Sequence, residues 1–264
     1  IQAYINNSNA DIALGNVIGS NVANFGLILG LSALLVPIHV KNTIIKRDLP
    51  YLILISTLFV IIMYYFQSQA VIARIEGVIL LLFFFYYIRL LFKEKKIDVD
   101  IVTSESSLKK NVFILIIGLI GVSLGGFFVT SSAEKLAIEL LVNVFQMNPD
   151  QVITLVGLSV VAIGTSLPEL VTTLTAIKKG DHDIAIGNVV GSNLFNILLV
   201  VGLSSTIIPL GVTSSVIFDG VLLIIIVLLT YVYLLIKKNT SKLLGIFLLL
   251  TYIAYLIFII TRSI

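Results

Sequence analysis

Long apolar runs separated by short polar connections dominate this sequence. A helix that crosses a bilayer needs about 20 mostly apolar residues, and eight runs approach or exceed that length. They cover residues 12–36, 49–66, 70–92, 112–142, 150–177, 184–209, 216–236 and 243–261. The run at 112–142 turns amphipathic after Val129, which favours a tilted helix or an interfacial tail, and residues 1–5 have the character of an earlier span's end. The pattern predicts an all-α polytopic membrane protein with eight full spans.

Composition supports a membrane location. The chain of 264 residues is 58% hydrophobic and only 12% charged, about half the charged fraction of a soluble domain. Lipid must therefore cover apolar surface that a core of this size could not bury. The net charge of +3 gives no reason to expect a nucleic-acid partner, and the absence of cysteine excludes disulfides and thiolate metal sites.

Basic residues are distributed unevenly between the two sides of the predicted bundle. Thirteen of the seventeen Lys and Arg residues fall on one side, in connections 37–48, 93–110, 178–182 and 237–242. The other side has at most Arg74, Lys135 and Arg262. The positive-inside rule makes the first side the cytoplasmic one and places the C-terminus outside.

A segment that begins at Ala10 recurs 172 residues later at His182, with sixteen of thirty-one positions identical. The identities include residues that are costly in a spanning helix: Gly15/Gly187, Asn16/Asn188, Gly19/Gly191, Ser20/Ser192, Asn21/Asn193, Asn24/Asn196 and Pro37/Pro209. The second copy begins five spans after the first, so the two copies run in opposite directions.

This inversion predicts two inverted-topology repeats of five helices, the first incomplete, an arrangement typical of secondary transporters. Residues 1–92 would hold the end of span 2 and spans 3–5. Residues 93–110 would form a cytoplasmic linker, and residues 111–264 would hold spans 6–10.

In each copy, Asn, Ser and Asn recur every four residues and so share one helix face. The two stripes are Asn16, Ser20, Asn24 and Asn188, Ser192, Asn196. One explanation is close helix packing along the neighbouring glycines, with the polar groups bonding between helices. The other is a duplicated ion site, which accounts better for three polar side chains on each helix.

The span before the second copy combines a proline with a buried acid. Pro168, the one proline placed inside a predicted span, should disrupt the helix near Gly164 and free carbonyl oxygens. Glu169 is the one acidic residue well inside a span, with Thr165 and Thr172 on the same face. A carboxylate among hydroxyl, amide and carbonyl oxygens suits a hard cation. A protonated, hydrogen-bonded structural acid is the alternative.

Other titratable residues lie near span ends. Glu76, Asp48, Asp150 and Asp219 are expected to be helix caps or interfacial charges. His39 and His182 fall at span edges, where interfacial histidines or a two-His metal site are both conceivable.

These motifs resemble those of the sodium/calcium exchanger branch of the calcium/cation antiporter superfamily. Its two α-repeats carry G-T-S-x-P-E on one helix and G-N-x-x-G-S-N-x-x-N/D on the next. Residues 164–196 match both motifs in full, and the first copy matches from Gly15 onward. The resemblance implies ten helices in two inverted halves, alternating access and electrogenic exchange of several Na⁺ for one Ca²⁺. We therefore expect a cell-membrane transporter rather than an enzyme, without a cofactor and functional as a monomer in the lipid bilayer.

The resemblance also implies a set of metal ligands: Glu169, Thr165, Ser166, Ala162, Asn24, Asn196, Ser20 and Ser192. The carboxylate would bind both ions. The two hydroxyls of the broken helix, with the nearby alanine carbonyl, would bind Na⁺. The two serines of the repeated helices would flank the outer Na⁺ sites, and the two asparagines would complete the centre.

The sequence departs from the family pattern at two points. Some prokaryotic members carry Asp where this chain has Asn196, which leaves ion stoichiometry and proton coupling open. The first G-T-S-x-P-E is absent, and the repeat spacing would place its Glu four positions before Ile1. We expect a further span and most of another upstream. Residues 1–264 alone should bind Ca²⁺ weakly, because one carboxylate cannot neutralise a dehydrated divalent ion.

Other functions remain open at this stage. Within transporters, the alternatives are a Ca²⁺/H⁺ exchanger or a K⁺-dependent Na⁺/Ca²⁺ exchanger. A cation channel is a less favoured possibility, because a single-chain inverted repeat with a broken helix favours alternating access. An intramembrane enzyme is disfavoured because Glu169 has no paired carboxylate, Ser–Lys or metal–His partner at its depth. A half without transport activity is also conceivable.

Overall fold

The computed structural model describes residues 8–65, 71–93, 108–146, 152, 156 and 162–263. In this part, the first half contains α1 (Ser8–Ala23), η2 (Asn24–Leu29), α2 (Gly30–Leu35), η3 (Ile44–Asp48), α3 (Leu49–Tyr65), β1 (Val71–Ile72) and α4 (Arg74–Lys93). The η segments are π-helical stretches within longer helices.

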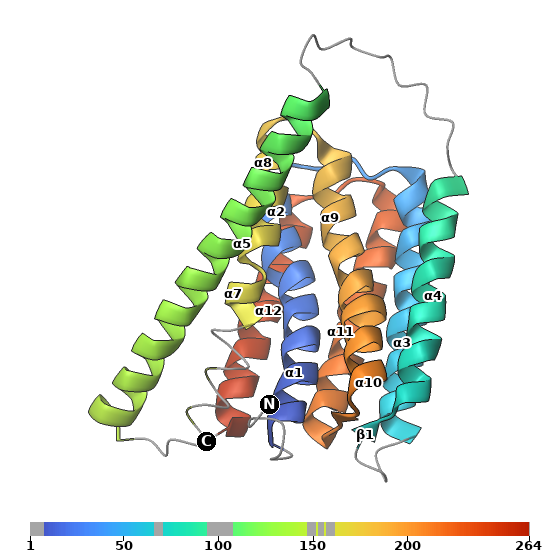
Figure 1. The fold of residues 1–264 in the computed structure, drawn as a ribbon. Coiled ribbons are helices and arrows are strands. Elements are labelled where there is room, and N and C mark those ends of the chain that lie inside the picture. Colours follow the sequence, from blue (N-terminus) through green and yellow to red (C-terminus); the bar gives the residue numbers. More distant parts are fainter. Residues whose placement is uncertain are drawn as a thin grey trace.

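The second half follows from Leu108. It contains α5 (Leu108–Glu139), η5 (Leu140–Val144), α7 (Ala162–Thr165), α8 (Leu167–Lys178), α9 (His182–Phe195), η7 (Asn196–Val201), α10 (Gly202–Ile207), β2 (Leu210–Gly211), α11 (Ser214–Lys237) and α12 (Lys242–Ser263). Figure 1 shows these helices gathered into one bundle, with the tilted α5 at its edge beside α7 and α8. The tilt agrees with the expectation for the long fourth run.

Seven helices of the described part are long and apolar enough to cross a membrane. They correspond to seven of the eight predicted spans. The eighth, at 150–177, is described continuously only from Ala162 onward, where it consists of α7 and α8. The predicted span end at 1–5 and most of the linker at 93–110 lie outside the described residues.

Large apolar side chains face outward along the bundle. Phe85 on α4, Phe127 on α5 and Ile236 on α11 are all exposed. Continuous helices satisfy their own backbone hydrogen bonds, so such surfaces are stable in lipid. The pattern is that of a multi-pass membrane protein.

The two repeated segments lie in the middle of the bundle and run in opposite directions. In Figure 1, α1 rises toward α2, whereas α9 descends toward α10. The helices contact each other directly, α1 against both α9 and η7, and α9 against η2. The repeated polar residues therefore meet where the two segments cross.

Two glycine crossings join the halves. A Cβ added at Gly245 of α12 would lie 2.7 Å from the Gly30 carbonyl oxygen of α2, and one at Gly77 of α4 would lie 2.7 Å from the Thr206 amide nitrogen of α10. Gly202, the counterpart of Gly30 in the second repeat, has the Gly77 carbonyl oxygen 3.3 Å from its own added Cβ. Each half thus supplies a helix that packs backbone to backbone on the other half's repeated segment.

Short extended segments connect the halves at both ends of the bundle. After α10, Leu210 and Gly211 pair antiparallel with Ile72 and Val71 of β1. After α2, His39 forms an antiparallel bridge with Asn239, and the His39 Nδ1 and Asn239 Oδ1 atoms are 2.8 Å apart. This contact connects the segment after α2 in the first half to the connection between α11 and α12 in the second.

The acids expected at span ends are buried. Asp219 is fully buried, and both of its oxygens accept hydrogen bonds of 3.0 Å from Arg262. Asp48 accepts bonds from Arg47 at 2.7 Å and from the Tyr87 hydroxyl at 3.1 Å. Glu76 is also buried, with one oxygen lacking a hydrogen-bond partner among the described residues. The expectation of helix caps was wrong for Asp48 and Asp219, which lie inside helices and bond to arginines. Glu76 does lie in the first turn of α4, and Asp150 lies outside the described residues.

A second proline also lies inside a membrane-length helix. Pro50 follows the π-helical stretch Ile44–Asp48, within the helix that spans Ile44–Tyr65. The predicted span at 49–66 would place this proline at the start of the helix. A π-helical turn shifts the hydrogen-bond pattern and can accommodate the missing N–H and the ring of proline.

We expect Gly245→Ala to lower the free energy of unfolding by about 1–3 kcal/mol, since the added methyl group would meet backbone atoms that cannot turn aside. Gly121→Ala in α5 is the matched control, because nothing described lies within 4 Å of its added Cβ. Thermal unfolding in detergent, followed by circular dichroism, measures both. Equal stability of the two variants would contradict the close crossing.

We expect Arg262→Leu to destabilise the protein by about 3–5 kcal/mol, because it leaves the Asp219 carboxylate buried without its partner. Adding Asp219→Leu to that variant should recover much of the loss, since it removes the uncompensated charge. Chemical denaturation of the two variants tests this. If the double variant is less stable than Arg262→Leu, the ion pair is not what Arg262 provides.

Candidate functional site

The candidate site lies at a break between α7 and α8. Helix α7 ends at Thr165, α8 begins at Leu167, and Ser166 between them has φ −91° and ψ −2°. The break was expected near Gly164 and occurs at Ser166. Pro168 lies in the first turn of α8, where a missing N–H costs no helical hydrogen bond. Glu169 also lies in this first turn, where the helix dipole favours a negative charge.

Helix α5 covers the break from one side. A Cβ added at Gly126 of α5 would lie 3.2 Å from the Pro168 ring, and one added at Gly164 would overlap the side chain of Thr130. Close contact between α5 and the broken helix therefore requires small residues on both partners.

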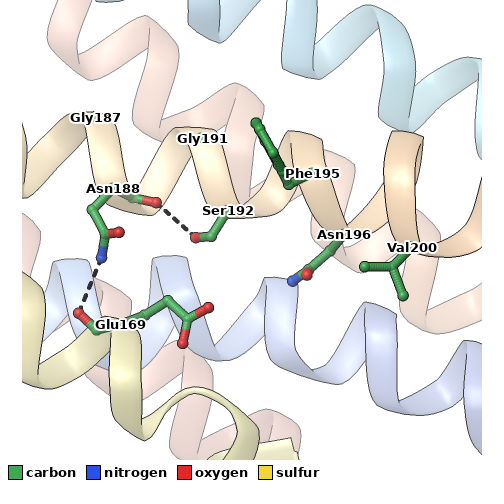
Figure 2. A pocket seen from close by; sticks show the side chains of 8 residues that line it. All are labelled: Glu169, Gly187, Asn188, Gly191, Ser192, Phe195, Asn196 and Val200. Atoms are coloured by element: carbon green, nitrogen blue, oxygen red, sulfur yellow. Dashed lines mark hydrogen bonds between the residues drawn. The ribbon is translucent and has the colours of Figure 1, made fainter. Parts of the chain in front are cut away.

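Glu169 faces a cavity of about 460 Å³ lined by Glu169, Gly187, Asn188, Gly191, Ser192, Phe195, Asn196 and Val200. Figure 2 shows the Glu169 carboxylate directed toward the polar face of α9 and η7, between Asn188 and Asn196. One of its oxygens is buried and accepts no hydrogen bond from the described residues. An oxygen in that situation needs a proton or a cation for stability.

Asn188 attaches the broken helix to α9. Its amide donates to the Glu169 carbonyl oxygen at 3.1 Å and to Thr173 Oγ1 at 3.0 Å. Both amide hydrogens bond between helices, so the packing explanation of the polar stripe applies to this residue.

The serine and the last asparagine of each stripe bond reciprocally between the two repeats. The Asn24 amide donates to Ser192 Oγ at 3.1 Å, and the Asn196 amide donates to Ser20 Oγ at 3.3 Å. The Asn24 side-chain oxygen is buried without a hydrogen-bond partner among the described residues. Polar oxygens of both repeats are thus gathered at the crossing beside Glu169.

The two serine hydroxyls are held as acceptors. Ser20 Oγ donates to the Val17 carbonyl at 3.0 Å, and Ser192 Oγ lies 2.7 Å from the Asn188 carbonyl. With each proton directed to its own helix backbone, the oxygen lone pairs remain for asparagine or for a cation.

A π-helical stretch begins at the last asparagine of each stripe. Segment η2 starts at Asn24 and η7 starts at Asn196, which are equivalent positions. Such stretches are frequent at functional sites. The sequence carries no signal for these stretches, because the apolar residues that follow both asparagines also fit an ordinary helix.

The other proposed ligands lie at the break itself. Thr165 is exposed, with Oγ1 3.5 Å from Asn16 Oδ1, whereas Ser166 is buried. Ala162 begins α7. None of the three is among the residues that line the cavity. Thr172, expected on the same face as Glu169, donates instead to the Pro168 carbonyl at 2.8 Å.

The glycines of the second stripe border open space. A Cβ added at Gly187 or Gly191 would have no described atom within 4 Å. Within the described residues, these two glycines shape the cavity and do not form a helix contact. Phe195 also lines it and packs edge-on against Phe84, with ring centroids 5.0 Å apart; its apolar character hid this role in the sequence.

Electrical charge at the cavity comes mainly from one group. In the ranges that the structure describes, no three His, Cys, Asp or Glu side chains cluster. The carboxylate of Glu169 is therefore combined with neutral amide and hydroxyl oxygens, a donor set that suits Na⁺ or Ca²⁺ better than a transition metal.

Comparison with known proteins identifies relatives. The chain is 30% identical to the sodium/calcium exchanger MaX1 of Methanosarcina acetivorans, over 93% of this chain and 79% of that protein. It is 32% identical to the inner membrane protein YrbG of Escherichia coli K12, over 75% of this chain but only 61% of that protein.

Solved structures of the sodium-calcium exchanger NCX_Mj are similar as well. One soaked with 10 mM Na⁺ and zero Ca²⁺ has a TM-score of 0.74 and 31% identity, covering 94% of this chain and 77% of that chain. The family described as sodium/calcium exchanger protein matches residues 1–93 and 110–261. This chain therefore belongs to the sodium/calcium exchanger family, a family of membrane transporters rather than enzymes.

Proposed function

We propose that this chain is a secondary active antiporter that exchanges Na⁺ for Ca²⁺ by alternating access. The observation that carries the proposal is the half-buried Glu169 carboxylate at a helix break, with one buried oxygen that has no partner among the described residues, facing the crossing of two antiparallel polar stripes. The printed names of MaX1 and NCX_Mj as sodium/calcium exchangers support the same ions.

The donor set explains why two different ions could compete. Ca²⁺ prefers six to eight oxygen ligands at about 2.3–2.6 Å, in flexible geometry. Na⁺ is also bound by oxygen and carries half the charge, so neutral hydroxyl and carbonyl oxygens can hold it without a second carboxylate. Competition for the shared carboxylate couples release of one ion to binding of the other.

We assign the ions to the residues as follows. The Glu169 carboxylate binds Ca²⁺ or Na⁺, and Asn24 and Asn196 complete the centre. Na⁺ sites use oxygens of Ser20 and Ser192 and, at the break, of Thr165, Ser166 and Ala162. The central residues are supported by the reciprocal hydrogen bonds between the repeats.

For the architecture, we propose two inverted-topology repeats of five helices. Residues 1–92 belong to the first repeat and residues 111–264 to the second, joined by a linker at 93–110. Opposed central segments and reciprocal packing of α4 on α10 and α12 on α2 support the inversion. Eight full spans in a monomer, with basic loops in the cytoplasm and the C-terminus outside, complete the proposal.

We expect Glu169→Gln to lower Na⁺-driven Ca²⁺ uptake by about a hundredfold or more, because a neutral amide loses interactions with an ion worth about 3 kcal/mol. The full-length protein is reconstituted into Na⁺-loaded vesicles, and ⁴⁵Ca²⁺ uptake is followed. Glu76→Gln is the control, since this buried acid lies outside the cavity. Uptake driven by a proton gradient, or uptake that requires K⁺, would identify a different coupling ion. Equal uptake by wild type and Glu169→Gln would contradict ion binding by Glu169 and would indicate a structural role instead.

We expect Ser192→Ala to raise the Na⁺ concentration required for half-maximal exchange by about three- to tenfold, because the substitution removes one neutral oxygen ligand. Ser205→Ala is the matched control. Ser205 is a buried serine that also donates to its own helix backbone, at 2.7 Å to Val201, but lies away from the cavity. If the two variants have the same Na⁺ dependence, Ser192 does not bind Na⁺.

A further inference from the structure

Asn196 has both amide hydrogens committed. Its Nδ2 donates to Ser20 Oγ at 3.3 Å and to Asn21 Oδ1 at 2.9 Å. Only the side-chain oxygen is then left for the cavity that Asn196 lines. For a cation, this orientation is essential, because a flipped amide would present N–H groups that repel positive charge.

Of the two residues that accept from Asn196, only Asn21 favours one of the two possible orientations of the Asn196 amide over the other. In the structure Ser20 donates to Val17 and accepts from Asn196, but a hydroxyl can rotate its proton and donate instead, so Ser20 alone would tolerate a flipped Asn196 amide. The Asn21 amide is itself fixed, since its Nδ2 donates to the backbone carbonyl of Asn193 at 3.3 Å. A backbone carbonyl can only accept, so Asn21 must direct its oxygen toward Asn196.

We propose that Asn21 is a positioning residue that locks the Asn196 amide with its oxygen toward the ion. The proposal rests on the proposed function of Asn196 as an ion ligand. The Asn193 carbonyl fixes the orientation of the Asn21 amide, and the Asn21 oxygen in turn fixes the orientation of the Asn196 amide. Asn21 is fully buried in α1, so no water competes for these bonds.

The equivalent residue of the second repeat has a different role. Asn193 is also fully buried, but its amide donates to the Val189 carbonyl of its own helix at 2.7 Å. Within the described part of the chain, its side-chain oxygen has no hydrogen-bond partner, and Asn24 bonds only to Ser192. The two halves of the site are therefore not identical, and the Asn196 side is the one with a fixed amide.

This difference provides a matched control for Ca²⁺ binding by the full-length protein. Asn21→Ala should weaken the apparent Ca²⁺ affinity by about tenfold, the scale of one buried hydrogen bond, whereas Asn193→Ala should change it less than about twofold. In an Asn196→Ala background, Asn21→Ala should add less than about twofold, because its effect passes through that amide. Equal losses in Asn21→Ala and Asn193→Ala, or a full loss in the Asn196→Ala background, would overturn the proposal.

A second measurement is independent of ion binding. In protein labelled with ¹⁵N-asparagine, the Asn196 side-chain signals are assigned from their absence in Asn196→Ala. Both amide protons should exchange slowly with solvent in the wild type and rapidly in Asn21→Ala, but remain slow in Asn193→Ala. Rapid exchange in the wild type would refute the locked amide, even if Asn21→Ala and Asn193→Ala do not fold. Failure of wild type to bind Ca²⁺ would refute the proposed function, and the exchange rates would still decide the role of Asn21.

Discussion

Burial of polar side chains at the crossing of α1 and α9 is the constraint on which the rest of the structure depends. Amides and hydroxyls inside a membrane protein must find partners, since neither lipid nor bulk water is available to them. Here each repeat supplies the partners for the other, through the Asn24–Ser192 and Asn196–Ser20 bonds. This reciprocity fixes the register of the two segments and leaves oxygens over for an ion. The glycine crossings and extended segments at the two ends then hold the halves in that register.

The broken helix adds the charge that this polar crossing lacks. Pro168 allows α8 to begin deep in the bundle, and Glu169 is thereby placed in a first helical turn beside α9. Asn188 bonds to the Glu169 carbonyl and prevents the two helices from separating. In the second stripe, Asn188 therefore has a structural role, and the ion ligands that we propose are the serine and the last asparagine. Helix packing and ion binding are therefore not exclusive explanations of the polar stripe.

The spans and the polar crossing could be predicted from the sequence, because lipid strongly restricts the length and polarity of the helices that cross it. Apolar length gave seven spans that the structure describes, and the repeat at an offset of 172 residues identified the polar crossing. The predictions that were wrong concerned residues whose environment is set by neighbours far away in the chain. Asp219 looks like an interfacial charge until α12 places Arg262 beside it, and Pro50 looks like a helix start until η3 extends the helix backward. The roles of Asn21 and Asn193 could not be separated either, since identical residues at equivalent positions differ only in the acceptors that packing provides.

The central claim is that Na⁺ and Ca²⁺ compete for one site built around Glu169. Equilibrium binding of ⁴⁵Ca²⁺ to the purified full-length protein, titrated with Na⁺ at constant ionic strength, tests it most directly. We predict that Na⁺ displaces Ca²⁺ with a slope greater than one, which means more than one Na⁺ for each Ca²⁺, and that choline does not. Bound Ca²⁺ that remains unchanged as Na⁺ rises would contradict a shared site.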